Sequence, residues 1–166
     1  MTVIRPIMWP AIRPARAGEA ESLTALCLRS KAHWGYDADF MQRSARTLVV
    51  RPAEIDAGRV VVAVDGEDRP LAVASVLGDG RIADLDLLFV DPPAMGGGAG
   101  RALFAAAVEL AQGLGASTLT ILADPNAASF YERVGARFVR NAPSDAIPGR
   151  SLPLYEYDLS TLGPKP

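Results

Sequence analysis

The spacing of apolar positions changes along the chain from a helical repeat to a strand repeat. Residues 18–31 place Leu23, Leu26, Cys27 and Ser30 at helical spacing, with acidic residues in the first turn, where the helix dipole favours them. This segment is therefore predicted to be an amphipathic helix. Further helical segments are expected at 38–46, 53–57, 100–114 and 127–134.

From residue 60 onward the period becomes two. Val60–Asp65 and Leu71–Leu77 flank a turn-rich segment and predict a hairpin. Ile82–Val90 follows a second turn signal, Gly78-Asp79-Gly80, so three successive strands should form an antiparallel meander. The remaining strands are expected at 11–14, 118–123, 138–140 and 154–159, with an irregular lead-in at 4–9 and a loop at 141–153.

The strand at 82–90, the helix at 100–114 and the strand at 118–123 predict a right-handed βαβ unit with parallel strands. The expected fold class is therefore α/β, with a mixed, mostly antiparallel central sheet, one βαβ unit and helices on both faces. The chain of 166 residues shows no repeats and is predicted to form a single domain over 1–166.

Composition narrows the partners. Apolar residues make up 49% of the chain and charged residues 22%, which is ordinary for a globular protein. A formal charge of −2 argues against nucleic acid as a partner. Cys27 is the only cysteine and is expected to be a small buried hydrophobe. No apolar run suits a membrane span or a signal peptide, so we expect a cytoplasmic location and no membrane partner.

The segment Leu85–Leu103 carries the clearest chemical signal: an apolar strand, a glycine-rich loop and the first turn of a helix. Free backbone N–H groups and the helix dipole make such a turn an anion site. Glycine permits close approach and unusual backbone angles because it has no Cβ. We therefore expect residues 96–101 to bind a ligand that contains a diphosphate.

A dinucleotide-binding fold is one alternative. Its fingerprint requires a third glycine, but the chain has Leu103 at that place counting from Gly98, and Arg101 counting from Gly96. Asp124 does follow the next strand, where a ribose-binding carboxylate would lie. The helices and antiparallel strands before residue 82 still argue against this fold, and a P-loop is excluded because no Gly-Lys-Ser/Thr follows.

Four segments together resemble the GNAT superfamily of N-acetyltransferases over nearly the whole chain. Leu88–Pro92 is similar to the family's central strand and the proline after it, and Gly98–Leu103 to the end of its diphosphate loop. Ala123–Ala136 is similar to its second CoA motif, and Ile147–Tyr155 to the closing hairpin of one branch. Met95 departs from the pattern, because the family usually has Arg or Gln there. With the additional glycines nearby, this departure predicts somewhat weaker CoA affinity.

The resemblance implies an enzyme that uses acetyl-CoA as co-substrate and needs no metal. A primary amine would attack the thioester directly, without a covalent enzyme intermediate, and a small-molecule acceptor is favoured over a protein. The alternative is a non-catalytic acyl-CoA-binding sensor or regulatory module. The final strand is a candidate for pairing across a homodimer.

The resemblance assigns Tyr131 as the acid that protonates the leaving thiolate; the alternative is a tyrosine that only packs its helix on the sheet. Asp84 and Asp86 are candidate bases, with Asp84 the better match, and alternation predicts both on the face of Leu88 and Val90. They could equally be a solvent-facing pair. The backbone N–H near Leu88 would polarise the thioester carbonyl. Cofactor-binding residues are expected to be Leu88, Phe89, Val90, Gly96, Gly97, Gly98, Ala99, Gly100, Arg101, Asn126, Ala128 and Tyr131.

Asn126 is expected either to bind the pantetheine arm or to cap the helix that follows Pro125. The aromatic break between the first two helices should line the acceptor site, unless it only packs the helix–helix turn. Its residues are His33, Trp34 and Tyr36. Three arginines are either contacts for the 3′-phosphate of CoA or solvated surface charges: Arg101, Arg133 and Arg137.

Overall fold

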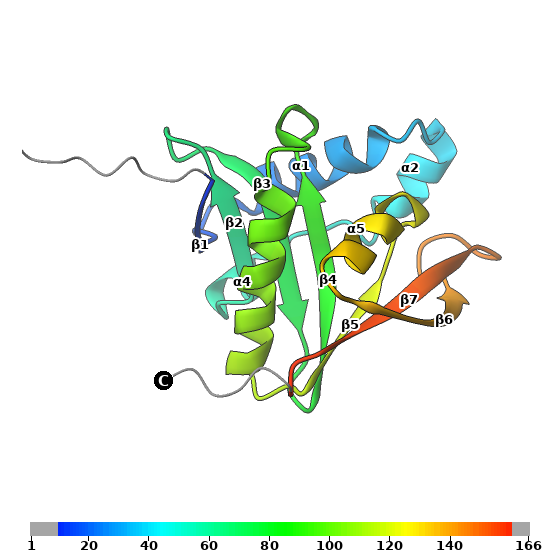
Figure 1. Ribbon diagram of the computed structural model, residues 1–166. Helices are drawn as coiled ribbons and strands as arrows, with labels where there is room; N and C mark the ends of the chain where they lie inside the picture. The colour runs from blue at the N-terminus through cyan, green and yellow to red at the C-terminus, as the bar shows by residue number, and fades with distance from the viewer. Residues whose placement is uncertain (1–9, 161–166) are drawn as a thin grey trace, which may run out of the picture.

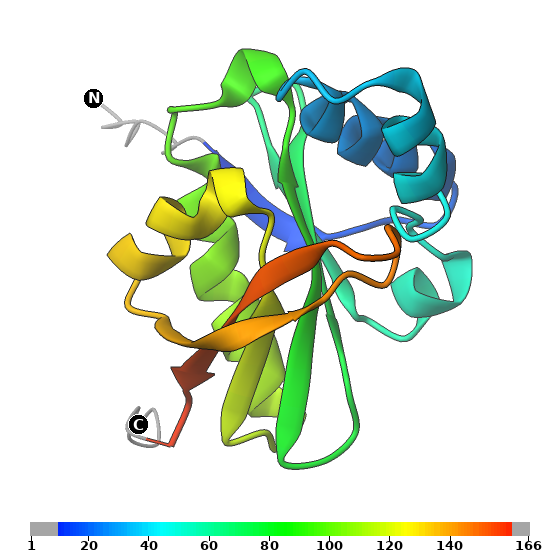
Figure 2. The same cartoon turned by 90° about the vertical axis from the view of Figure 1, so that its right-hand side faces the viewer.

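The computed structural model describes residues 10–160 and shows a seven-stranded sheet with helices on both faces (Figures 1 and 2). The strand order is β1-β2-β3-β4-β5-β7-β6. The strands are β1 (Ala11–Pro14), β2 (Val60–Val64), β3 (Pro70–Leu77), β4 (Ile82–Val90), β5 (Thr118–Leu122), β6 (Arg137–Pro143) and β7 (Ser151–Asp158). The helices are α1 (Ala20–Ala32), α2 (Ala38–Ser44), α3 (Pro52–Asp56), α4 (Ala99–Gly113) and α5 (Ala128–Arg133), with 3₁₀ turns η1 (Pro92–Ala94) and η2 (Pro125–Ala127).

The sheet opens in its middle. Strands β4 and β5 are parallel and pair only over Ile82–Asp84 and Thr118–Thr120, while the other strand pairs in the described residues are antiparallel. Beyond these pairs β4 continues toward η1, β5 continues toward η2, and the two strands diverge (Figure 1). The parallel βαβ unit and the mostly antiparallel sheet are thereby confirmed.

A β-bulge in β4 sets which side chains face which layer. Val76 of β3 pairs with Leu85, and Ser75 pairs with Leu87, so Asp86 is an extra residue between them. Leu85 consequently packs in the core under α4, whereas Leu87 packs in the core under α1.

The bulge corrects the prediction that Asp84 and Asp86 share a face with Leu88 and Val90. Those two apolar residues pack on the α4 side, on the same side as Leu85, and Asp84 faces the other way. Strict alternation fails because the bulge shifts the phase of the strand by one residue.

The two faces of the sheet have separate cores. Helix α4 packs against β2, β3 and β4 on one face, and α1 packs against β3 and β4 on the other. Between α4 and the sheet lies an aromatic group in which Phe104, Phe130 and Tyr131 meet edge to face. This group fixes α5 against α4 and so determines where Tyr131 lies.

The end of the chain differs from the sequence prediction. Strands β6 and β7 are longer than expected, so the predicted loop at 141–153 shrinks to residues 144–150. Strand β7 has β5 on one side and β6 on the other. Its pairing edges are thus occupied, and a dimer formed by strand pairing would have to use β1 or β6. The predicted lead-in at 4–9 lies outside the described residues.

Candidate active site

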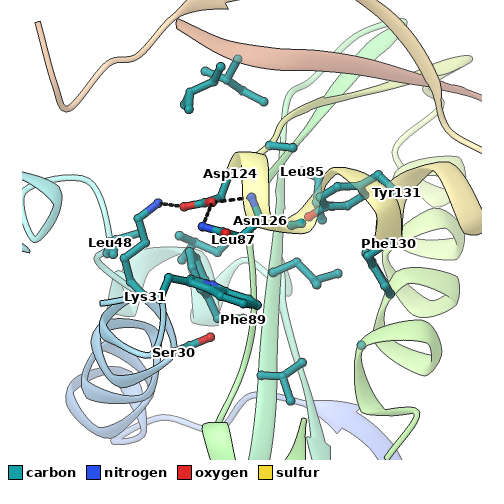
Figure 3. Close-up of a pocket in the computed structure, with 18 of the residues that line it drawn as sticks. Ser30, Lys31, Leu48, Leu85, Leu87, Phe89, Asp124, Asn126, Phe130 and Tyr131 are labelled. Carbon is teal, nitrogen blue, oxygen red and sulfur yellow. Dashed lines mark hydrogen bonds and ion pairs between the residues drawn. The ribbon is translucent and has the colours of Figure 1, made fainter. Parts of the chain in front are cut away.

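A cavity of about 680 Å³ opens where β4 and β5 diverge (Figure 3). Its walls come from β4, the glycine loop, the start of α5, the end of α1 and the loop between β6 and β7. Of the sequence-predicted site residues, most line this cavity: Trp34, Asp84, Asp86, Leu88, Phe89, Val90, Gly96, Gly98, Ala99, Gly100, Arg101, Asn126 and Tyr131. The others do not: His33, Tyr36, Gly97 and Ala128.

The glycine loop has the geometry of an anion site. Gly96 and Gly98 have φ values of 82° and 86°, a region that side chains rarely adopt, and Gly98 is the N-cap of the 15-residue helix α4. Among the described residues, no acceptor engages the N–H groups of Gly96, Gly98 and the first three helical residues, Ala99–Arg101. Five free donors and the positive end of the helix dipole therefore suit a diphosphate.

Gly100 adds a second reason for glycine in this loop. A Cβ at this position would lie 3.5 Å from side-chain atoms of Val90 and Phe130. Alanine would just fit, but any longer side chain would push into the contact between β4 and α5. Close packing therefore restricts position 100 to a small residue, whereas backbone conformation favours glycine at Gly96 and Gly98.

Tyr131 is 5% exposed, and its ring packs among Phe104, Phe130 and Tyr155. Its hydroxyl points from α5 toward the cavity (Figure 3), and no side chain or backbone group of residues 10–160 hydrogen-bonds to it. Burial, and to a lesser degree the charge of Asp124, raises the pKa of this phenol above its ordinary value. The ring thus packs in the core while the hydroxyl oxygen faces the cavity, and the role of Tyr131 as the acid stays a prediction.

The two candidate bases differ in environment. Asp84 accepts a 2.8 Å hydrogen bond from the hydroxyl of Thr120, and burial raises its pKa despite this bond. The side chain of Asp86 is exposed to solvent, but the protein atoms around its carboxyl group still remove part of its hydration. Desolvation first, and then the charges of Asp84 and Glu54, raise the pKa of Asp86 to about 6.

A charged cluster around Asp124 closes the end of the cavity that the α1–α2 segment covers (Figure 3). Lys31 Nζ lies 2.5 Å from Asp124 Oδ2, and both side chains are nearly buried. The Tyr36 hydroxyl donates to the same carboxylate at 2.9 Å, and Arg150 lies 3.9 Å from it. Burial alone would raise the pKa of Asp124, but Lys31 and the other donors lower it on balance.

Two residues that line the cavity, Lys31 and Arg150, were not predicted as site residues from the sequence. One signal for Lys31 was present: it continues the buried stripe of α1 formed by Leu23 and Cys27, four residues apart each time. A lysine on an apolar stripe requires a buried partner. For Arg150, which lies in the loop between β6 and β7, no local signal exists.

Asn126 does not cap a helix, which corrects one of its two predicted roles. Asp124 caps η2 by accepting from the Asn126 backbone N–H at 2.8 Å, and α5 has no side-chain cap. The Asn126 side chain instead donates to Tyr36 Oη at 3.1 Å and to Asp124 at 3.0 Å. It thereby joins the start of α5 to the α1–α2 segment.

The aromatic residues of the α1–α2 segment lie in different places. Trp34 is 46% exposed and lines the cavity, with the ring of His33 against it at 5.2 Å outside the cavity. Tyr36 stacks on Phe40 at 4.0 Å and contacts the cavity wall through Asp124. Only Trp34 of the three predicted acceptor residues therefore lines the cavity directly.

The arginines considered for the 3′-phosphate also separate. Arg101 and Arg133 line the cavity, whereas Arg137 lies on β6 and pairs with Glu156 at 3.2 Å. Within residues 10–160, no group of three or more His, Cys, Asp or Glu side chains is placed to hold a metal ion. None of the helices described there has the length and apolar character needed to cross a bilayer.

Residues 38–145 match the family described as acetyltransferase (GNAT) domain. This match covers more than half of the chain, and the chain therefore belongs to the GNAT family. No match was found among curated proteins.

Solved structures agree on the fold. A GCN5-related N-acetyltransferase from Rhodopseudomonas palustris is 23% identical, with a TM-score of 0.72 over 93% of this chain and 99% of that one. The PaiA N-acetyltransferase of Thermoplasma acidophilum, in complex with coenzyme A, is 15% identical, with a TM-score of 0.72 over 89% and 98%. YncA of Salmonella typhimurium, with acetyl-CoA, is 20% identical, with a TM-score of 0.64 over 90% and 94%.

Proposed function

We propose that this protein is an N-acetyltransferase that moves the acetyl group of acetyl-CoA directly to the primary amine of a small molecule. The observation that carries the proposal is that one cavity holds a set of free loop amides, the carboxylate of Asp86 and the hydroxyl of Tyr131. These three features are what diphosphate binding, amine deprotonation and thiolate protonation require. The relatives solved with coenzyme A or acetyl-CoA support the choice of co-substrate.

The glycine loop would hold the diphosphate of acetyl-CoA through the N–H groups of residues 96–101. Backbone amides provide this contact, so Met95 removes only the side-chain contribution that Arg or Gln would make. The pantetheine arm would then run between β4 and α5, beside Leu88 and Phe130. This path directs the thioester toward the bulge at Asp86 and toward Tyr131.

In the proposed reaction the acceptor ammonium first gives a proton to Asp86. An alkylammonium has a pKa of about 10.4. The pKa difference between this ammonium and a base with a pKa of about 6 is smaller than the difference from an ordinary carboxylate, so proton transfer to Asp86 is less unfavourable. The resemblance favoured Asp84 as the base, but its carboxylate already accepts the Thr120 hydroxyl. We therefore assign the base to Asp86, with Asp84 as the neighbour that raises the pKa of Asp86.

The amine nitrogen then bonds to the acetyl carbon, and the carbon–sulfur bond breaks. Tyr131 donates its proton to the leaving thiolate, and the amide nitrogen releases its second proton, which restores the phenol through solvent. The raised pKa of Tyr131 keeps the phenol protonated at neutral pH, but it also makes the phenol a weaker acid than a thiol, so the proton released by the nitrogen is needed to restore it. No bond to the enzyme forms at any stage.

A small acceptor is favoured because two segments are joined at the acceptor end of the cavity. Arg150 of the β6–β7 loop, which lines the cavity, bonds to Tyr36 of the α1–α2 segment at 3.0 Å. A lysine side chain on a protein would have to reach past this contact. The single-domain organisation and the cytoplasmic location stay predictions.

Acetyl-CoA turnover by the purified protein tests the proposal. Release of CoA thiol should depend on an added amine, and kcat/KM should fall as the pH is lowered through about 6, where Asp86 takes up a proton. Tyr131→Phe should lower kcat by about 10²-fold or more while leaving CoA affinity unchanged. The same substitution at Tyr157, which packs on Phe104 at 5.2 Å outside the cavity, is the matched control.

Asp86→Asn should lower kcat and remove the pH limb near 6. Tight CoA binding with no amine-dependent thiol release from a broad amine panel would contradict the enzyme and favour the acyl-CoA sensor. Equal losses of turnover and CoA affinity in Tyr131→Phe would contradict the role of Tyr131 as the acid.

A further inference from the structure

Arg150 lies at the acceptor end of the cavity with most of its hydrogen-bonding capacity unused. Its side chain is 20% exposed and lines the cavity from the β6–β7 loop. The guanidinium lies over the stacked rings of Phe40 and Tyr36, 4.7 Å and 5.2 Å from their centroids. These contacts hold the plane of the guanidinium in one orientation.

A guanidinium has five N–H donors. In the described part of the chain, one of these donors makes a hydrogen bond, from Arg150 Nη2 to the Tyr36 hydroxyl at 3.0 Å. The other four donors are not buried without a partner, because Arg150 lines the cavity and its nitrogens can meet water or a bound molecule there. An acceptor for these donors can therefore come from a molecule bound in the cavity.

The nearest carboxylate does not neutralise Arg150. Asp124 lies 3.9 Å from it but is already bound by Lys31 at 2.5 Å. The carboxylate also accepts hydrogen bonds from Tyr36 and from Asn126. Two cations therefore share one anion, and the cluster carries an excess positive charge that faces the cavity.

The same cavity is also lined by negative charge, at Asp84, Asp86 and Asp145. Asp145, in the same loop as Arg150, is near enough to Asp84 and Asp86 for its charge to raise the pKa of both carboxyl groups. The acceptor end thus has a group of carboxylates suited to an ammonium and a guanidinium suited to an anion. A simple alkylamine or a diamine would match the carboxylates only.

We propose that the acceptor is an amino acid or a close analogue, with its amine at Asp86 and its carboxylate bound by Arg150. This inference rests on the proposed function and adds the substrate class. Arg150 acts as a specificity-determining residue, because its planar donors match both oxygens of a carboxylate. The bond to Tyr36 and the stacking on Phe40 present the remaining donors to the cavity.

Binding of acetylated products tests the carboxylate site without depending on turnover. The probes are N-acetylleucine and N-(3-methylbutyl)acetamide, which differ only in the carboxylate, titrated calorimetrically into the protein saturated with CoA. Neither probe carries an amine, so differences in amine pKa do not enter. We expect N-acetylleucine to bind at least tenfold more tightly, because a carboxylate on a guanidinium forms charge-assisted bonds.

Arg150→Gln should abolish this preference, and Arg150→Lys should keep part of it, since lysine retains the charge without the planar donors. Arg140→Gln is the matched control, because Arg140 is an exposed arginine of β6 that does not line the cavity. If Arg150→Gln does not fold, the comparison of the two probes on the unmodified protein still shows whether the cavity prefers a ligand with a carboxylate. Equal binding of the probes, tighter binding of the amide, or no binding of either overturns the proposal.

Turnover separates this inference from the proposed function. Acetylation of lysine and of cadaverine, which differ by a carboxylate, should favour lysine at least tenfold in kcat/KM. If the kcat/KM for cadaverine equals that for lysine, the proposed acetyltransferase function is supported and the carboxylate site at Arg150 is contradicted. If no amine is acetylated but N-acetylleucine binds through Arg150, the carboxylate site is supported and the proposed acetyl-transfer reaction is contradicted.

Discussion

The Lys31–Asp124 ion pair should be a large single contribution to the stability of the fold. Its side chains are 11% and 13% exposed, and they join α1 to the end of β5. Lys31→Met keeps a side chain of similar length but leaves the carboxylate without its closest cation. Removing one partner of a buried pair costs about 3–5 kcal/mol, since it leaves a charge without compensation.

The value for Lys31→Met should fall at the lower end, about 3 kcal/mol. Arg150 remains 3.9 Å from the carboxylate, and the Tyr36 hydroxyl and the Asn126 amide still donate to it. For a chain of this size, about 3 kcal/mol corresponds to a Tm lower by about 6–12 °C. Urea unfolding monitored by circular dichroism measures the free energy directly.

The pH dependence follows from the pKa of Asp124. Burial is the largest influence on this carboxyl and raises its pKa, but the donors lower it overall, so its stabilising contribution is present above the unfolded pKa of about 3.9. That contribution is lost as the pH falls through the lowered folded pKa. In Lys31→Met the influence of burial remains while the nearest cation is gone, so the carboxyl takes up its proton at a higher pH. The stability difference between the two proteins should therefore shrink as the pH is lowered from neutral toward the unfolded pKa of about 3.9 and below it.

The control is Arg137→Met, which breaks the exposed pair with Glu156. Those side chains are 74% and 35% exposed, so the loss should stay below about 1 kcal/mol. Lys31→Met/Asp124→Asn should recover part of the stability that Lys31→Met loses, since the uncompensated charge is removed. A loss below about 1 kcal/mol in Lys31→Met, or a loss that does not change with pH, would refute this account of the pair.

Two further predictions concern the glycine loop and the cysteine. Gly98→Ala forces an alanine to a φ of 86°, so it should destabilise the fold by about 1 kcal/mol and weaken CoA binding. Gly113→Ala lies at the end of the same helix with open space around it. It should stabilise the fold by up to about 1 kcal/mol and leave CoA binding unchanged. Equal CoA affinities in these two variants would argue against a role for the loop conformation. Cys27 is fully buried, and burial raises the pKa of its thiol to about 12. A thiol reagent at neutral pH should therefore react with Cys27 only at the rate at which the protein unfolds. Fast labelling of the native protein would contradict this prediction.

The elements with regular periodicity were the predictable part of the fold. Strands β1 and β4 have the predicted bounds, and β4 is bounded by the Gly78-Asp79-Gly80 turn on one side and Asp91-Pro92 on the other. Strand β6 was predicted too short, since it lies at the sheet edge and most of its residues are exposed, which leaves no alternation to read. Pro153 lies within β7, where proline is normally a sign against a strand interior.

One part of the candidate site could be predicted from the sequence, and another part could not. The glycine loop was predictable because its amides, its turn and its helix are contiguous in sequence. The charged cluster was not, since Lys31 is 93 residues from Asp124 and Tyr36 is 114 residues from Arg150. The bulge at Asp86 also has no local signal, because it arises from how β3 and β4 pair.

The opening of the sheet accounts for both the cavity and the charged cluster. Because β4 and β5 stop pairing after Asp84 and Thr120, the end of β5 lies beside a cavity without a strand partner on that side. Asp124, two residues beyond β5, therefore needs partners from elsewhere: hydrogen-bond donors come from α1 and the α1–α2 segment, and the charge of Arg150, 3.9 Å away, comes from the β6–β7 loop. Since Asp124 also caps η2, which leads into the helix of Tyr131, the residues that would contact the acceptor are mechanically joined to the proposed acid. A change at the acceptor end, such as loss of Lys31, should consequently lower kcat as well as raise KM for the amine, even though Lys31 takes no part in proton transfer.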